Sequence, residues 1–150
     1  MNSDSLYQPI KALKFNALQF LGAIGAILGA FFPIAEAIAQ CPSTINTFPY
    51  QEGFETNPAW TSGGTASDWA WGTPSHPSIN TAAEGTKGWF VGSLSGTYYE
   101  FGQQSWLESP CFDFTALQYP YISFKLYWEC ERQYDGLGFQ YSLDQGTTWS

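Results

Sequence analysis

Apolar and polar residues alternate strictly in the second half of the chain. In YISFKLYWECE, residues 121–131, one apolar residue occupies every second position. A period of two is typical of a β-strand with one buried face. We therefore predict a strand over residues 121–131 whose inward-facing side chains are Ile122, Phe124, Leu126, Trp128 and Cys130.

The alternation returns in GLGFQYSL, residues 136–143, after a loop that carries an Asp-Gly turn signal. Here Leu137, Phe139, Tyr141 and Leu143 share one face. Shorter patterns predict strands over 48–54, 68–72, 88–94 and 105–114, with Pro110 breaking the last strand or marking an edge, and a long loop over 73–88. No long apolar stripe of helical period follows residue 40. Many short strands joined by turn-rich loops indicate an all-β fold, a jelly-roll β-sandwich.

The first 39 residues have a different pattern. Lys11 and Lys14 precede a stretch without charge from Phe15 to Ala35, and Ala37-Ile38-Ala39 forms a small-residue cleavage site. This arrangement predicts a helical secretory signal peptide that is cleaved after Ala39. A retained membrane anchor is the alternative, because about 20 apolar residues can cross a bilayer; the membrane would then be contacted through this segment alone. A lipoprotein is a weaker alternative. Cys41 follows the cleavage site closely, but the residue before it is Gln40, where a lipoprotein signal needs Gly or Ala. The predicted domains are a signal peptide (1–39), a linker (40–47) and a β-sandwich (48–150).

Charge and cysteine content narrow the function. The net charge is −8 and aromatic residues make up 19% of the chain. Nucleic acid is excluded as a partner because phosphate contacts need a basic surface, and the aromatic content argues against disorder. An exported chain is allowed disulfides. Cys41, Cys111 and Cys130 permit one intrachain bridge, and the sequence leaves all three pairings open.

The segment SLDQGTTW, residues 142–149, resembles an Asp-box, the hairpin signature of sialidase-type propellers. In such a hairpin, Asp144 would accept backbone N–H groups, Gly146 would supply a turn conformation and Trp149 would fold back onto the strands. These roles are structural. A propeller needs the motif repeated, and the chain has one copy. We therefore predict a sandwich hairpin whose second strand begins at Thr147. Because that strand is short, we expect the sandwich to be incomplete at its C-terminus and the chain to be the N-terminal piece of a longer polypeptide.

The region from Phe48 to Trp149 resembles the MAM domain family, in the variant found in secreted and surface proteins of Bacteroidetes-type bacteria. The resemblance is carried, in order, by EGFE, SDWAWGTPSHP, AAEGTKGWF, SWLESPCFDF, YISFKLYWECE and DGLGFQYSLD. It implies a jelly-roll sandwich that serves adhesion or recognition in multidomain extracellular proteins, in which a peptidase domain often follows. The cysteines are fewer than in animal members and differently placed, so the resemblance implies no disulfide pattern.

The candidate chemistry is binding and not catalysis. His76 is the only histidine, and no triad or zinc spacing accompanies it, so we predict no catalytic residues. Glu55 and Asp113, with Glu131 or Asp135, are candidate ligands of a structural Ca²⁺; a solvated acidic face is the simpler interpretation. Asp113 is expected to point outward, because it lies between Phe112 and Phe114, which are expected to face inward. Tyr121 and Tyr127 are candidates for stacking on sugar rings.

These observations together predict a non-catalytic extracellular adhesion or recognition module that binds a protein or a glycan. The alternatives are a carbohydrate-binding module of a secreted hydrolase and the non-catalytic front of a secreted peptidase.

Overall fold

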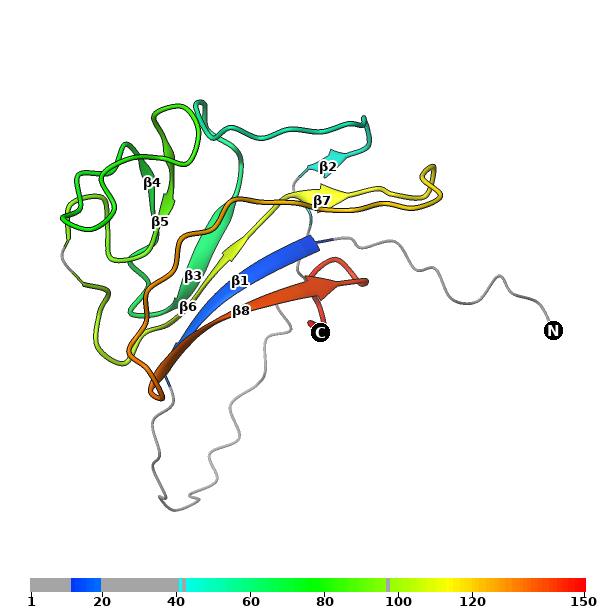
Figure 1. Ribbon diagram of the computed structural model, residues 1–150. Coiled ribbons are helices and arrows are strands. Elements are labelled where there is room, and N and C mark those ends of the chain that lie inside the picture. Colours follow the sequence, from blue (N-terminus) through cyan, green and yellow to red (C-terminus); the bar gives the residue numbers. More distant parts are fainter. Residues whose placement is uncertain (1–11, 20–40, 42, 97) are drawn as a thin grey trace, which may run out of the picture.

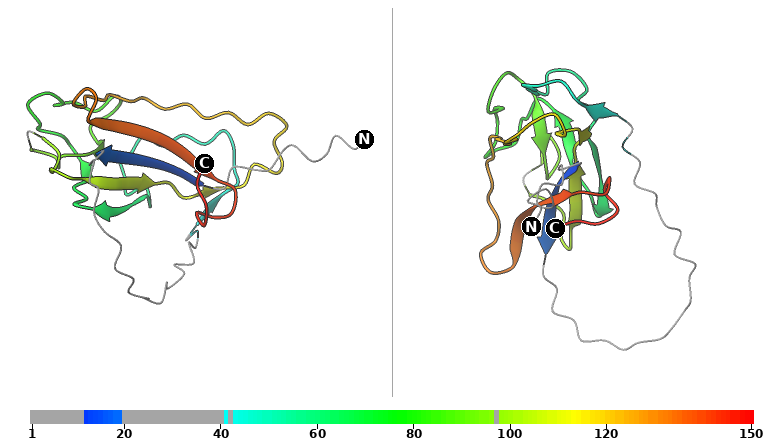
Figure 2. Two further views of the ribbon diagram at one scale, coloured as in Figure 1. Left: turned by 90° about the horizontal axis from the view of Figure 1, so that it is seen from below. Right: turned by 90° about the vertical axis from the view of Figure 1, so that its right-hand side faces the viewer.

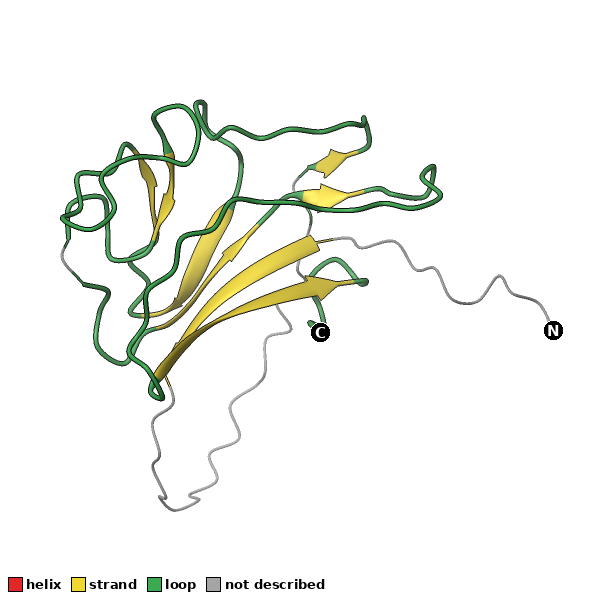
Figure 3. Cartoon of the chain, viewed as in Figure 1, coloured by secondary structure: helices red, strands yellow, loops and turns green. Residues whose placement is uncertain are grey.

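A computed structural model describes residues 12–19, 41, 43–96 and 98–150, and these residues form strands and loops only (Figures 1 and 3). No helix that could span a membrane occurs among them. The all-β fold class is therefore confirmed for the part of the chain that is described. The strands are β1 (Ala12–Gln19), β2 (Thr44–Ile45), β3 (Thr61–Thr65), β4 (Ala70–Gly72), β5 (Gly88–Phe90), β6 (Gln104–Glu108), β7 (Cys111–Phe112) and β8 (Asp135–Ser142).

The largest sheet has four strands in the order β3-β6-β1-β8, and each neighbouring pair is antiparallel. Figure 2 shows β3 and β8 at its two edges. β1 is central: Lys14 pairs with Glu108 of β6 on one side and with Gln140 of β8 on the other. Two small sheets complete the fold, a parallel pair of β2 and β7 and an antiparallel pair of β4 and β5.

The strand β1 differs from the predicted helical signal peptide. Residues 12–19 are extended and paired on both sides, whereas residues 20–40 lie outside the described part of the chain. The sequence offers a reason, because Leu13, Phe15 and Ala17 alternate with Lys14 and Asn16, which is the period of a strand. Cleavage after Ala39 stays a prediction from the sequence.

The hydrophobic core lies where β2 and β7 meet the segment that follows β2. Phe112 and Phe114 are buried and stack with their ring centroids 5.4 Å apart. Phe48 packs on Phe114 at 5.2 Å, and Tyr50 meets the edge of Phe112 at 5.8 Å. The alternation of Phe112 and Phe114 about the more exposed Asp113 places both rings inward, as the sequence predicts.

A disulfide closes the chain over this core. It joins Cys41 to Cys111, the first residue of β7, across a sequence separation of 70 residues. Cys111 is itself buried. The structure thus selects one of the three pairings that the sequence left open and leaves Cys130 as a free thiol.

The strand predicted over 121–131 is not formed. These residues have no regular secondary structure, and Phe124 and Trp128, predicted to be buried, are 50% and 64% exposed. The apolar face of β8 is also uncovered, since Phe139, Tyr141 and Leu143 are exposed. The described residues therefore lack the predicted two-layered packing. The place beside β8 that a preceding antiparallel strand would take is held by β1. On the outer edge of β8, Tyr141 exchanges two backbone hydrogen bonds with Ser150.

Several shorter predictions are confirmed. Strands occur within the predicted ranges 68–72 and 88–94, and the chain between them is a loop. Pro110 separates β6 from β7, as its missing N–H predicts. The strand predicted over 48–54 is wrong; this segment is irregular and contributes its aromatic rings to the core.

Candidate recognition surface

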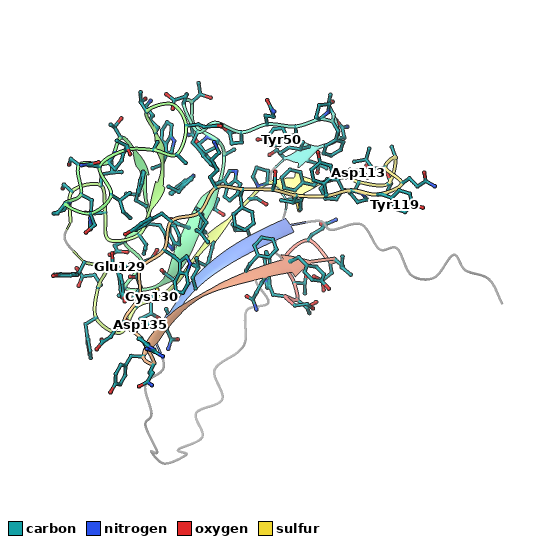
Figure 4. The ribbon with its side chains drawn as sticks, viewed as in Figure 1. Tyr50, Asp113, Tyr119, Glu129, Cys130 and Asp135 are labelled. Atoms are coloured by element: carbon teal, nitrogen blue, oxygen red, sulfur yellow. A yellow bond between two sulfur atoms is a disulfide. The ribbon has the colours of Figure 1, made fainter. Side chains whose placement is uncertain are left out.

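A row of exposed aromatic side chains follows the segment 119–128, which runs past the sheet on its way to β8 (Figure 4). Tyr121 is 88% exposed, and Tyr119 and Tyr127 are also well exposed. We call these three tyrosines the tyrosine surface. Figure 4 places Tyr119 at the end of the molecule that also carries Asp113 and Tyr50. Exposed aromatic rings of this number are uncommon unless they contact a partner.

A hollow in the protein surface lies beside Tyr121. A shallow cavity of about 180 Å³ is lined by Phe114, Pro120, Tyr121, Ile122, Phe124 and Phe139. Its lining is apolar, and Phe124 and Phe139 stack within it with centroids 5.4 Å apart. A flat apolar group, such as one face of a sugar ring or an aromatic side chain, could lie against such a wall.

Tyr127 has a polar partner at its tip. Its hydroxyl donates to Oε2 of Glu129 at 3.1 Å. This hydrogen bond, with the negative charge of Glu129, raises the pKa of Tyr127 above its ordinary value. Tyr127 is 60% exposed, which leaves its ring accessible for stacking.

The four carboxylates predicted as calcium ligands do not form one group, although Glu131 and Asp135 are joined by a backbone hydrogen bond. Figure 4 places Asp135 at the start of β8 and Asp113 beside β7, on the far side of the molecule. The described residues contain no group of three or more His, Cys, Asp or Glu side chains that could hold one ion. Calcium binding stays a prediction from the sequence. The structure instead gives each of Glu55, Asp113 and Asp135 a protein donor.

Glu55 accepts hydrogen bonds from the loop that leads into β5. Its Oε1 accepts the backbone N–H groups of Thr86 and Lys87 at 2.7 and 2.9 Å, and its Oε2 accepts the Thr86 hydroxyl at 2.8 Å. These donors lower the pKa of Glu55, the backbone N–H of Thr86 most of all. At the other end, Asp113 accepts the N–H and hydroxyl of Thr115 at 3.0 and 2.6 Å, which is a local turn contact.

Asp135 and Glu131 meet around Tyr99, a residue that the sequence analysis did not single out. The Tyr99 hydroxyl donates to Oδ2 of Asp135 and accepts the N–H of Glu131 at 3.5 Å. Burial, and then the bond to Asp135, raise the pKa of Tyr99 to about 12. Nearby, burial and the charge of Asp135 raise the pKa of the Cys130 thiol, which keeps it in its unreactive protonated form. Nothing in the sequence pattern indicated this contact, because Tyr99 lies 36 residues from Asp135.

The turn after β8 is closed by Asp144. Its Oδ1 accepts the Thr148 N–H at 2.8 Å and its Oδ2 accepts the Thr148 hydroxyl at 2.6 Å. The Ser142 hydroxyl donates to Oδ1 of Asp144 and accepts the N–H of Gly146, whose φ of +86° favours glycine. Trp149 is half-buried. The Asp-box remains a resemblance. The second strand predicted from Thr147 is not formed: no strand follows β8, and only Ser150 pairs back with Tyr141, because Asp144 and Ser142 hold residues 144–148 in a turn.

We predict that the hydrogen bonds of Asp144 in this turn are lost only in strong acid. The Thr148 hydroxyl and N–H, and then Ser142, lower the pKa of Asp144 from 3.8 to about 2. A depressed pKa stabilises the folded state fully above the unfolded value and loses that contribution as pH falls through the folded one. The Thr148 amide signal in NMR should therefore titrate near pH 2. The T148V variant, which lacks the hydroxyl, should move the midpoint upward; a midpoint near 3.8 in the unsubstituted chain would contradict the assignment.

His76 lies in the loop between β4 and β5. Its Nδ1 accepts the N–H of Ser78 at 3.3 Å, a local contact in the same loop. Known proteins add no further indication: no protein-family model matches the chain, and searches of curated proteins and of solved structures find no match.

Proposed function

We propose that this chain is a non-catalytic recognition module that acts outside the cell. The observation that carries the proposal is the tyrosine surface, an exposed aromatic row next to an apolar hollow. The Cys41–Cys111 disulfide supports an oxidising compartment, as does the leader-like pattern of residues 1–39. The MAM-like order of motifs in the sequence agrees with a role in adhesion.

A glycan is the ligand that the exposed rings favour. Tyr121 and Tyr127 fall at positions of the same parity in the alternating segment, so an extended backbone would place both rings on one face. In an extended chain the six residues from Tyr121 to Tyr127 span about 20 Å, so the two rings could stack on sugar units several places apart in one oligosaccharide. The acidic net charge of −8 favours neutral or basic sugars over acidic ones. On this basis we place the carbohydrate-binding alternative ahead of a protein ligand.

The Y121A/Y127A variant tests the proposal. On a glycan array and by titration with the best glycan, we expect the double variant to bind about tenfold more weakly, because each aromatic contact contributes about 0.5–1.5 kcal/mol beyond its buried area. Y98A is the matched control, since Tyr98 is as exposed but lies on a different loop. Unchanged affinity in Y121A/Y127A would refute the tyrosine surface as the binding site. An array without any bound glycan would leave a protein as the ligand.

A further inference from the structure

Two segments of the chain fit the same position in the four-stranded sheet. The first, ALKFNALQ at 12–19, is β1 and lies between β6 and β8. The second, SFKLYWEC at 123–130, alternates like a strand but forms none. Both place a lysine between two large apolar residues, LKF at 13–15 and FKL at 124–126. We propose that residues 123–130 are the alternative occupant of the β1 position and take it when residues 1–39 are removed. This rests on the proposed export, because cleavage is what vacates the position.

The direction of the chain agrees with this exchange. β1 is antiparallel to both of its neighbours. Residues 123–130 enter β8 through a tight turn, so beside β8 they would run antiparallel to it and in the direction of β1. They would then also be antiparallel to β6. The segment 123–130 and β8 would then be consecutive in the chain and neighbours in the sheet, as is most common.

One closure of the turn before β8 gives a register that coincides with that of β1. The carbonyl of Glu131 accepts the N–H groups of Tyr134 at 3.2 Å and of Asp135 at 3.0 Å, and Gln133 has a φ of +76°. A two-residue hairpin closed by Glu131 and Tyr134 would pair Lys125 with Gln140 and Leu126 with Phe139. Lys14 and Phe15 hold these two places in β1. The two lysines therefore occupy equivalent positions. Closure at Asp135 would shift the pairing by one residue and turn the apolar side chains to the other face, so the exchange requires closure at Tyr134.

The pairing with β6, on the other side of the β1 position, is also compatible with residues 123–130. Lys14 and Phe15 pair with Glu108 and Leu107 of β6. In the exchanged arrangement Lys125 would lie opposite Glu108, a favourable cross-strand charge pair, and Leu126 opposite Leu107. The pairing with β6 follows from the same alignment of Lys125 with Lys14, and a register shifted by one residue would turn every apolar side chain to the other face.

The N–H and C=O groups of β8 that the exchange requires point toward the β1 position. Tyr141 uses its N–H and C=O for Ser150 on the outer edge. In an antiparallel ladder alternate residues bond to opposite sides, so Gln140 and Ser142 direct theirs toward β1. The hairpin closed at Tyr134 needs the backbone groups of these same even-numbered residues.

The free energy favours the exchange once β1 is absent. Without β1, both β6 and β8 would present open edges, which natural proteins avoid. The segment 123–130 would fill them and remove Phe124, Leu126 and Trp128 from solvent, where each is now at least half exposed. It would give up the ion pair between Lys125 and Glu84, which is exposed and therefore contributes little. Tyr121 and Tyr127 would project from the opposite face and remain available to a ligand. The hollow beside Tyr121 would not persist, because Phe124, which lines it, would enter the sheet, so the tyrosine side chains alone would form the recognition surface of the cleaved chain.

Disulfide trapping in the full chain tests the proposal. The variant L126C/F139C, in a C130A background, places two cysteines opposite each other in the exchanged register. K14P/N16P is added to disable β1, because proline cannot donate the strand hydrogen bonds directed at β8. The control pair is F124C/F139C, which joins residues whose rings are in contact in the present structure. Mass spectrometry of peptides after mild oxidation gives the fraction of chains with each cross-link.

We expect the 126–139 cross-link to form in most K14P/N16P chains and to exceed the 124–139 cross-link there, with the order reversed when β1 is intact. A K14P/N16P chain whose introduced thiols at positions 126 and 139 stay reduced, or in which the 124–139 link still dominates, overturns the proposal. Because proline disables β1 without any cleavage, the result does not depend on export. A signal segment found to be retained would contradict the proposed export alone.

Discussion

Removing the Cys41–Cys111 disulfide should lower the free energy of unfolding by roughly 4 kcal/mol. The bridge closes a loop with a sequence separation of 70 residues, and the chain-entropy model assigns about that amount to the restriction of the unfolded chain. A small domain has a total stability of only about 5–15 kcal/mol. Loss of this bridge should therefore leave a substantial fraction of the chain unfolded at about 37 °C.

Guanidinium unfolding of oxidised and reduced protein measures this difference. The C41A/C111A variant should match the reduced protein and be insensitive to reductant. C130A is the control, because Cys130 forms no disulfide, and its stability should depend on reductant as the unsubstituted chain does. If the oxidised and reduced proteins unfolded within about 1 kcal/mol of each other, the disulfide would have little structural role.

The F114A variant should lose about 3–5 kcal/mol, the usual cost of truncating a buried phenylalanine. Phe114 is 6% exposed and packs against Phe112 and Phe48, at the centre of the core beside β2 and β7. Removing its ring leaves a cavity between two rings that cannot both move inward. F114L, which keeps most of the volume, should cost less than about 1.5 kcal/mol.

F101A provides the comparison for this core. Phe101 is 88% exposed, and a surface truncation of this kind usually changes stability by less than about 0.5 kcal/mol. Thermal and guanidinium unfolding of the variants gives the ranking F114A, F114L, F101A from most to least destabilised. Equal stability of F114A and F101A would show that the Phe112–Phe114 cluster is not the core of the fold.

Local patterns in the sequence predicted the features that depend on neighbouring residues. The alternation in 136–143 became β8, Pro110 separated β6 from β7, and Phe112 and Phe114 pointed inward about Asp113. In each case steric and hydrogen-bonding rules within a few residues decide the outcome. The same holds for the turn around Asp144, whose hydrogen bonds reach four residues at most.

Features that depend on distant parts of the chain were not predictable in this way. The sequence showed that 121–131 is suited to a strand, but pairing is a competition, and in this structure β1 occupies the place beside β8. The choice of Cys41 as the partner of Cys111, and the contact of Tyr99 with Asp135, likewise depend on which segments the fold brings together. The exposed apolar residues of 122–128 are the visible consequence of that competition.

We propose that the chain is an exported, disulfide-bonded recognition module, and the state in which the protein is recovered after export tests this proposal. The full chain is expressed in a bacterium, recovered from outside the cytoplasm, and analysed by N-terminal sequencing and by mapping of its disulfide. We predict that the recovered protein begins at Gln40, with Cys41 linked to Cys111 and Cys130 free. A protein that stays in the cytoplasm with three reduced cysteines would contradict the account.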